Sequence, residues 1–115
     1  MMSGYDKKNE KDIPWRNEDS GPKYLFRGPN IDWGLILYKP GQQLGKHYHE
    51  EVEETFYILE GNPTFIIDEK EIQTEPGVAI KVEKKHSHDI LNKSDKDCKI
   101  LFIKWPYLPK DKVNV

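Results

Sequence analysis

Apolar residues occur along this chain in short runs rich in β-branched and aromatic side chains, which recur from Tyr24 onward between turn-forming residues. Runs of this length, bounded by Gly, Pro, Asn and Asp, are typical of β-strands. No stretch keeps apolar residues at a helical period for long enough to predict a helix. The pattern predicts strands at residues 23–27, 33–38, 44–49, 54–60, 63–68, 70–73, 78–82, 86–91 and 98–105. Many short strands at even spacing predict an all-β fold, either an antiparallel sandwich or a barrel.

The fourth predicted strand has two distinct faces. Glu54, Phe56 and Ile58 share one face, because side chains on a strand repeat every second residue. If Glu54 points into the barrel, Phe56 and Ile58 line the same interior and form the wall of a pocket. Tyr57 and Leu59 then point outward and pack against a second element or another subunit. A shift of one residue in the register would exchange the two faces completely.

The composition excludes several classes of protein. The 115-residue chain has 18 basic and 20 acidic residues without a basic stripe, so we expect no nucleic-acid partner. No apolar run approaches the roughly 20 residues that cross a bilayer, and the polar N-terminus lacks the apolar segment of a signal peptide. The single Cys98 excludes an internal disulfide and fits a reducing compartment. We therefore expect a soluble, cytoplasmic protein with no membrane partner.

The chain is predicted to form one domain preceded by an arm. Residues 1–20 are mostly polar and form an arm that is either loose or docked by Trp15, and residues 21–115 form a single barrel domain. We expect residues 105–109 to form an extended tail that packs on the barrel or on a partner subunit. The alternative is that this segment forms a lid over the pocket. The arm and the apolar outer face of the fourth strand favour a homodimer.

All four histidines of the chain lie in two short segments, as the pairs His47, His49 and His86, His88. Each pair is spaced i, i+2, which places both side chains on one side of an extended strand. Glu54 follows His49 by five residues, and a turn between them would return it on the neighbouring antiparallel strand, about 5 Å away. A third histidine from the second pair would complete the group. The sequence therefore predicts a metal site on a β-sheet.

The spacing of these residues resembles a known motif. Gly41, five residues, His47-x-His49, four residues, Glu54, six residues and Gly61 fill every fixed position of the first motif of the cupin superfamily. The resemblance identifies the chain as a small, single-domain metal-binding cupin. It implies the fold of that superfamily, a double-stranded β-helix of antiparallel strands, which is a form of jelly-roll barrel.

The second cupin motif is only partly present. When the pattern begins at Gly77, its histidine falls on His88 and its asparagine on Asn92. Glu83 and Lys85 occupy the positions of the motif's proline and second glycine, so the turn before the histidine forms differently here. Because the distance from that turn to His88 is preserved, we expect the ligand to be retained.

The resemblance implies that His47, His49, Glu54 and His88 hold one divalent transition metal ion. Imidazoles with a carboxylate suit Fe, Mn, Ni, Cu or Zn and do not choose among them. Four protein ligands leave coordination positions open for water, substrate or dioxygen. His86 is then expected at the mouth of the pocket or behind the ligands, although it is the rival of His88 as a ligand.

The cupin resemblance implies several functions. A fully liganded barrel favours a metal-dependent enzyme, dioxygenase-like, that acts on a small polar molecule. The alternatives are a non-catalytic module that binds a sugar or a carboxylate, and a sugar isomerase or epimerase. An epimerase-like site normally contains a further acid–base side chain, and His86 is the only histidine left unassigned. One fold hosts many chemistries, so the residues of the site must distinguish among these functions.

Overall fold

The computed structural model describes residues 4–115, and within that range it contains ten strands and one short 3-10 helix. The helix is η1 (Glu10–Asp12), and the strands are β1 (Gly21–Arg27), β2 (Asp32–Tyr38), β3 (His47–His49), β4 (Glu53–Glu60), β5 (Thr64–Ile67), β6 (Lys70–Gln73), β7 (Ala79–Val82), β8 (His88–Leu91), β9 (Cys98–Trp105) and β10 (Lys112–Asn114). The predicted all-β fold is confirmed. No helix in residues 4–115 has the length and apolar character needed to cross a membrane.

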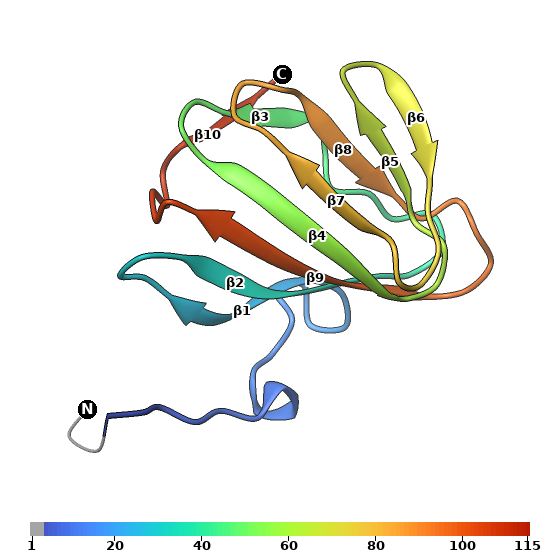
Figure 1. Ribbon diagram of the computed structural model, residues 1–115. Helices are drawn as coiled ribbons and strands as arrows, with labels where there is room; N and C mark the ends of the chain where they lie inside the picture. Colours follow the sequence, from blue (N-terminus) through green and yellow to red (C-terminus); the bar gives the residue numbers. More distant parts are fainter. Residues whose placement is uncertain (1–3) are drawn as a thin grey trace.

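Two antiparallel sheets of five strands face each other (Figure 1). One has the order β1-β2-β9-β4-β7, and the other has the order β10-β3-β8-β5-β6. From β2 to β10 the chain passes repeatedly from one sheet to the other, and the β5–β6 hairpin is the only consecutive pair of strands in that stretch that stays in one sheet. This winding is the predicted double-stranded β-helix of antiparallel strands.

The inner faces of the sheets form an apolar core. Phe56, Ile58, Phe65 and Ile100 are all fully buried there. Complete burial of such a side chain stabilises the fold by about 1.5–3 kcal/mol. Cys98 also belongs to the core, and burial raises the pKa of its thiol to about 11, so it stays protonated and unreactive.

The predicted alternation along β4 is confirmed. Glu54 is 4% exposed and lies on the inner face with the two apolar residues that follow it at every second position. Tyr57 is 43% exposed and Leu59 is 38% exposed, so both point outward. These two side chains remain available to a second subunit, and the homodimer stays a prediction.

Part of the N-terminal arm is docked on the body of the protein. The Glu10 carboxylate lies 2.7 Å from the amino groups of both Lys23 and Lys99, on β1 and β9. The Lys23 amino group also lies 4.0 Å from the centre of the Trp15 ring. Of the two arrangements that the sequence left open, the structure shows the docked one for this segment, and β1 begins at Gly21.

The C-terminal tail contains a strand that the sequence did not predict. β10 pairs with β3, so that Lys112 lies opposite His49 and Asn114 lies opposite His47. This segment is short and mostly polar, and it therefore lacks the alternation that identifies a strand. Pro106, Leu108 and Pro109 line the pocket, which is the position that the lid alternative described, whereas Trp105 is 56% exposed. Residues 105–109 lead the chain across to β10.

Two glycines of the first motif allow a direct test of why glycine is needed. Gly61 has φ of +78°, and a Cβ there would lie 2.5 Å from the Asp97 carbonyl oxygen. Gly41 has φ of +86°, but a Cβ there would meet no atom of the described chain within 4 Å. Gly41→Ala should therefore cost only the left-handed backbone strain, roughly 1–2 kcal/mol. Gly61→Ala should cost clearly more, because backbone must move. Urea unfolding of both variants measures the difference, and equal losses would contradict the role of the close contact.

Candidate metal centre

Four candidate ligands converge at one end of the barrel. One ligand atom from each of His47, His49, Glu54 and His88 lies within 4.8 Å of the others. The two histidines of β3 share a face, and His47 is paired across the sheet with His88 of β8. The structure therefore brings together the four residues that the cupin resemblance implied. All four are at most 5% exposed.

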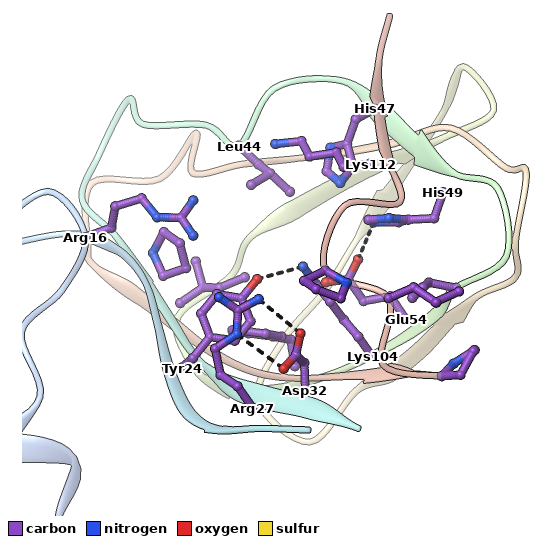
Figure 2. A pocket seen from close by; sticks show the side chains of 17 residues that line it. Arg16, Tyr24, Arg27, Asp32, Leu44, His47, His49, Glu54, Lys104 and Lys112 are labelled. Atoms are coloured by element: carbon purple, nitrogen blue, oxygen red, sulfur yellow. Dashed lines mark hydrogen bonds and ion pairs between the residues drawn. The ribbon is translucent and has the colours of Figure 1, made fainter. Parts of the chain in front are cut away.

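Glu54 reaches the histidines by a different route from the one predicted. We expected it on the strand next to β3, but β4 lies in the opposite sheet, between β9 and β7. β3 has no free edge for β4, because β10 and β8 already pair with its two edges. The turn after β3 therefore crosses the barrel, and Glu54 faces the histidines from the other sheet (Figure 2).

The crossing turn is held by the C-terminal tail. The Asp111 carboxylate accepts hydrogen bonds from the backbone N–H groups of Glu51 at 2.8 Å and Val52 at 2.9 Å. The Val52 side chain is 3% exposed and lines the pocket beside Glu54. The unpredicted strand β10 follows this contact directly, so the tail fixes both the strand that carries two histidines and the turn that delivers the carboxylate.

The ligand atoms fit a metal ion because they are buried and lack protein partners. Glu54 Oε1 lies 3.3 Å from both His49 Nε2 and His88 Nε2. Yet none of these three atoms makes a well-oriented hydrogen bond to any described residue. Leaving such an atom unpaired costs about 1–3 kcal/mol. An ion about 2.0–2.2 Å from each ligand would separate neighbouring ligand atoms by about 3.0–3.5 Å, which agrees with the two spacings of 3.3 Å.

His47 is held in the form that binds metal. His47 Nδ1 donates to the Gly45 carbonyl at 2.8 Å, and His88 Nδ1 lies 3.5 Å from the His86 carbonyl. A donor hydrogen on Nδ1 leaves Nε2 with its lone pair directed at the site. Burial lowers the pKa of the His47 imidazole to about 4, against a smaller opposing effect of the Gly45 carbonyl. His47 is therefore neutral at physiological pH.

The Glu54 carboxyl is ionised. Burial by itself raises the pKa of this group. The side chains of His49 and His88, when their Nε2 atoms carry a hydrogen in the absence of an ion, and the positive charge of Lys104 lower the pKa by more, so that it lies well below the ordinary value. An ionised carboxylate beside imidazole nitrogens is a donor set that suits a divalent transition metal ion.

The candidate ligands open onto a pocket of about 210 Å³. His47, His49 and Glu54 border it, and Ile36, Leu44 and Phe102 give it apolar walls. Figure 2 also shows charged and polar side chains that the sequence analysis did not identify, namely Arg16, Tyr24, Arg27, Asp32, Lys104 and Lys112. The position of Lys104 could have been predicted from the sequence, because it continues the two-residue alternation of inward-facing residues on β9 after Ile100 and Phe102.

Three predicted pocket residues lie elsewhere. Phe56 and Ile58 are fully buried in the apolar core and do not border the pocket, although the Phe56 ring lies 5.9 Å from that of His88. His86 is exposed and pairs with Asp68 on the surface. The two-residue alternation fails for His86 because β8 begins only at His88, so His86 lies in a turn.

The turn before His88 explains how the incomplete second motif still works. Lys85, at the position of the motif's glycine, has φ of +71°, the left-handed conformation that glycine adopts easily. Its N–H donates to the His49 carbonyl at 2.6 Å, which ties the turn to β3. The Asn92 side-chain amide donates to the carbonyls of Tyr38 at 2.9 Å and Lys96 at 2.7 Å. Lysine thus adopts the left-handed conformation at some cost in backbone strain, and asparagine anchors the end of β8.

Two histidine variants test the ligand set. His88→Ala should reduce the metal content from about one ion per chain to near none, because one of four ligands is lost. His86→Ala is the matched control, since this exposed histidine should contribute nothing to the ion. Elemental analysis gives the metal content, and circular dichroism verifies that the barrel remains folded. Retention of stoichiometric metal in folded His88→Ala would show that the ion does not depend on this site.

Comparison with known proteins places the chain in a family. The sequence profile of the family described as "Cupin domain" matches residues 34–104. The chain is 28% identical over 79 residues to polyketide synthase CurC of Streptomyces cyaneus, covering 67% of this chain and 50% of that protein. It is 25% identical over 81 residues to tetracenomycin polyketide synthase protein TcmJ of Streptomyces glaucescens, covering 70% and 54%. It thus spans about half the length of these curated relatives.

A solved structure shows the same architecture over nearly its whole length. The protein TT1209 of Thermus thermophilus superposes with a TM-score of 0.77 at 24% identity, covering 89% of this chain and 98% of that one. At this identity the likeness concerns the fold alone. With a family profile that matches well over half of its residues, a double-stranded β-helix and a buried group of three histidines and one glutamate, this chain belongs to the cupin family.

Proposed function

We propose that this chain is a metal-dependent enzyme that acts on a small polar molecule bound in the pocket. One observation carries the proposal: three buried ligand atoms, His49 Nε2, His88 Nε2 and Glu54 Oε1, face one another without partners among the described residues. Burying such atoms without partners is costly, and one bound ion would satisfy all three. Together with His47, these residues would hold one ion of Fe, Mn, Ni, Cu or Zn.

The residues around the site have definable roles. Glu54 lowers the net charge of the bound ion by one unit, and the hydrogen bond from His47 to the Gly45 carbonyl fixes the direction of its imidazole. When bound, the ion supplies Lewis acidity and, if redox-active, electron transfer to dioxygen. Ile36 and Phe102 give the pocket apolar walls near the candidate ligands, and polar interactions are stronger beside such walls than in bulk water.

Dioxygenase-like chemistry is the preferred form of this proposal. Three imidazoles and a single carboxylate suit redox-active metals, and four protein ligands leave positions open for a substrate and dioxygen. The pocket borders three of the four candidate ligands, so that a small molecule could reach an ion held there.

A second candidate function is favoured by one contact. The Lys104 amino group donates to the Tyr24 hydroxyl at 2.8 Å inside the pocket. A tyrosine beside a lysine can transfer a proton, and an isomerase or epimerase needs such a group. The sequence analysis had named no acid–base side chain other than His86, which lies on the surface. In this alternative the ion would polarise the substrate without changing its oxidation state.

The decisive experiment begins with elemental analysis of protein purified without chelator. We expect about one transition metal ion per chain, because four ligand atoms are preorganised for it. Protein loaded with Fe²⁺ is then tested in an oxygen electrode against a panel of small organic acids, thiols and catechols. Oxygen uptake that depends on one of these compounds supports the dioxygenase, and the His88→Ala variant is the control.

Other outcomes have clear meanings. Stoichiometric zinc that iron cannot replace, with no oxygen uptake, would contradict the redox form and favour the proton-transfer alternative or a non-catalytic binding module. Absence of metal even after reconstitution with each of the five ions would overturn the proposal as a whole.

A further inference from the structure

The pocket contains more positive than negative side chains. The positive ones are Arg16, Arg27, Lys104 and Lys112, and the negative ones are Asp32 and Glu54. Four positive charges less two negative charges leave an excess of two, before any ion is bound. Arg27 is already neutralised, because its guanidinium binds the Asp32 carboxylate at 3.2 and 3.3 Å. The excess therefore belongs to the three remaining cations.

Lys104 differs from the other lysines that are not exposed. Four lysines of the described chain are buried or partly buried, namely Lys23, Lys39, Lys99 and Lys104. The first three each lie 2.7 to 4.0 Å from a carboxylate oxygen. Around Lys104, by contrast, no carboxylate of residues 4–115 lies within 4.0 Å of the amino group. The ammonium group is partly buried and has the Tyr24 hydroxyl and the rings of Tyr24 and Phe102 as neighbours, but no close carboxylate, so it can bind an anionic ligand.

The position of Lys104 is fixed next to the candidate ligands. It lies directly opposite Glu54 in the pairing of β9 with β4. Figure 2 shows its side chain directed toward Tyr24, whose hydroxyl accepts a hydrogen bond from the amino group at 2.8 Å. An ammonium group has three donors, so further ones remain for a ligand. An ion bound at the histidines would neutralise Glu54 and leave Lys104 with even less compensation.

The tyrosine is itself rigidly held. Its ring packs edge-to-face on Phe102, with centres 5.1 Å apart, and the Arg27 guanidinium lies 4.0 Å from its centre on another side. The Tyr24 hydroxyl can therefore donate its hydrogen to a ligand from a fixed position while it accepts from Lys104. Arg16 and Lys112 are exposed residues of the pocket wall, and neither forms an ion pair within the described chain.

We propose that the pocket is a site for a small organic anion, in which Lys104 and the Tyr24 hydroxyl bind a carboxylate beside the candidate metal ligands. Arg16 and Lys112 attract the anion from solvent. This inference rests on the proposed function and names its substrate class, a small carboxylic acid. The apolar wall at Ile36 and Leu44 accommodates the carbon chain of such a molecule.

Calorimetric titration of the full chain loaded with Zn²⁺ tests the site without turnover. The probes are acetate and succinate, their uncharged amides acetamide and succinamide, and inorganic phosphate. We expect succinate to bind and succinamide not to bind, because only the former offers negative charge. Lys104→Met should weaken succinate binding by roughly tenfold or more, since it removes a charged donor in a partly dry pocket. Tyr24→Phe should weaken it less, and Lys104→Arg should partly restore it.

Lys81→Met is the matched control, because this exposed lysine of β7 lies outside the pocket and its loss changes the net charge equally. Succinate binding should be unaltered in this variant. The inference is overturned if the amides bind as well as the acids, if phosphate alone binds, if neither acid binds, or if Lys81→Met and Lys104→Met have equal effects. Elemental analysis and circular dichroism verify metal content and folding in each variant.

The same titration of chelator-treated protein separates this inference from the proposed function. Binding of succinate that depends on Lys104 in metal-free protein supports the anion site even where no metal is found. Stoichiometric metal with no preference for acids over amides retains the metal centre and overturns the anion site.

Discussion

The structure depends on burying three ligand atoms that the protein itself leaves without partners. Glu54 Oε1 and the Nε2 atoms of His49 and His88 meet in the interior, where each unpaired atom costs about 1–3 kcal/mol. Both sheets contribute candidate ligands, because the histidines belong to one sheet and Glu54 to the other. An ion at this point would therefore link the two layers as well as satisfy the atoms. The crossing turn and its contact with Asp111 matter because they bring Glu54 into that position.

The pairing of β4 with β9 explains how one barrel has both a core and a polar pocket. Glu54 lies opposite Lys104, Phe56 opposite Phe102, and Ile58 opposite Ile100. The strands run antiparallel, so each presents its charged residue at the same end and its aliphatic residue at the other. The interior thus changes from charged through aromatic to aliphatic along a single ladder. The aliphatic end of this ladder belongs to the core and stabilises the fold, and the charged end lies at the pocket beside the candidate ligands.

Much of this arrangement was predictable from the sequence because it is local. The shared face of His47 and His49 and the alternation along β4 follow from the two-residue period of a strand, and the resemblance to the cupin motifs added Glu54 and His88 to the ligand set. The sheet to which β4 belongs was not predictable, since that depends on which strands already occupy the edges of β3. The position of His86 was not predicted correctly because this residue follows the turn at Lys85 and precedes β8. Side chains outside a strand do not follow the two-residue alternation. The pocket cations were missed because they come from the arm, β1, β9 and the tail, far apart in sequence.

Charge links the metal centre to the proposed anion site. In the absence of an ion, Lys104 and Glu54 face each other across β9 and β4 and partly compensate one another. An ion that binds Glu54 removes this compensation, and Lys104 then gains more from a carboxylate than it did before. The anion in turn offsets the positive charge of the filled site. Each ligand should therefore strengthen the binding of the other by the same factor, as linkage requires. A pocket of this kind would be best suited to its anion when the metal is already in place.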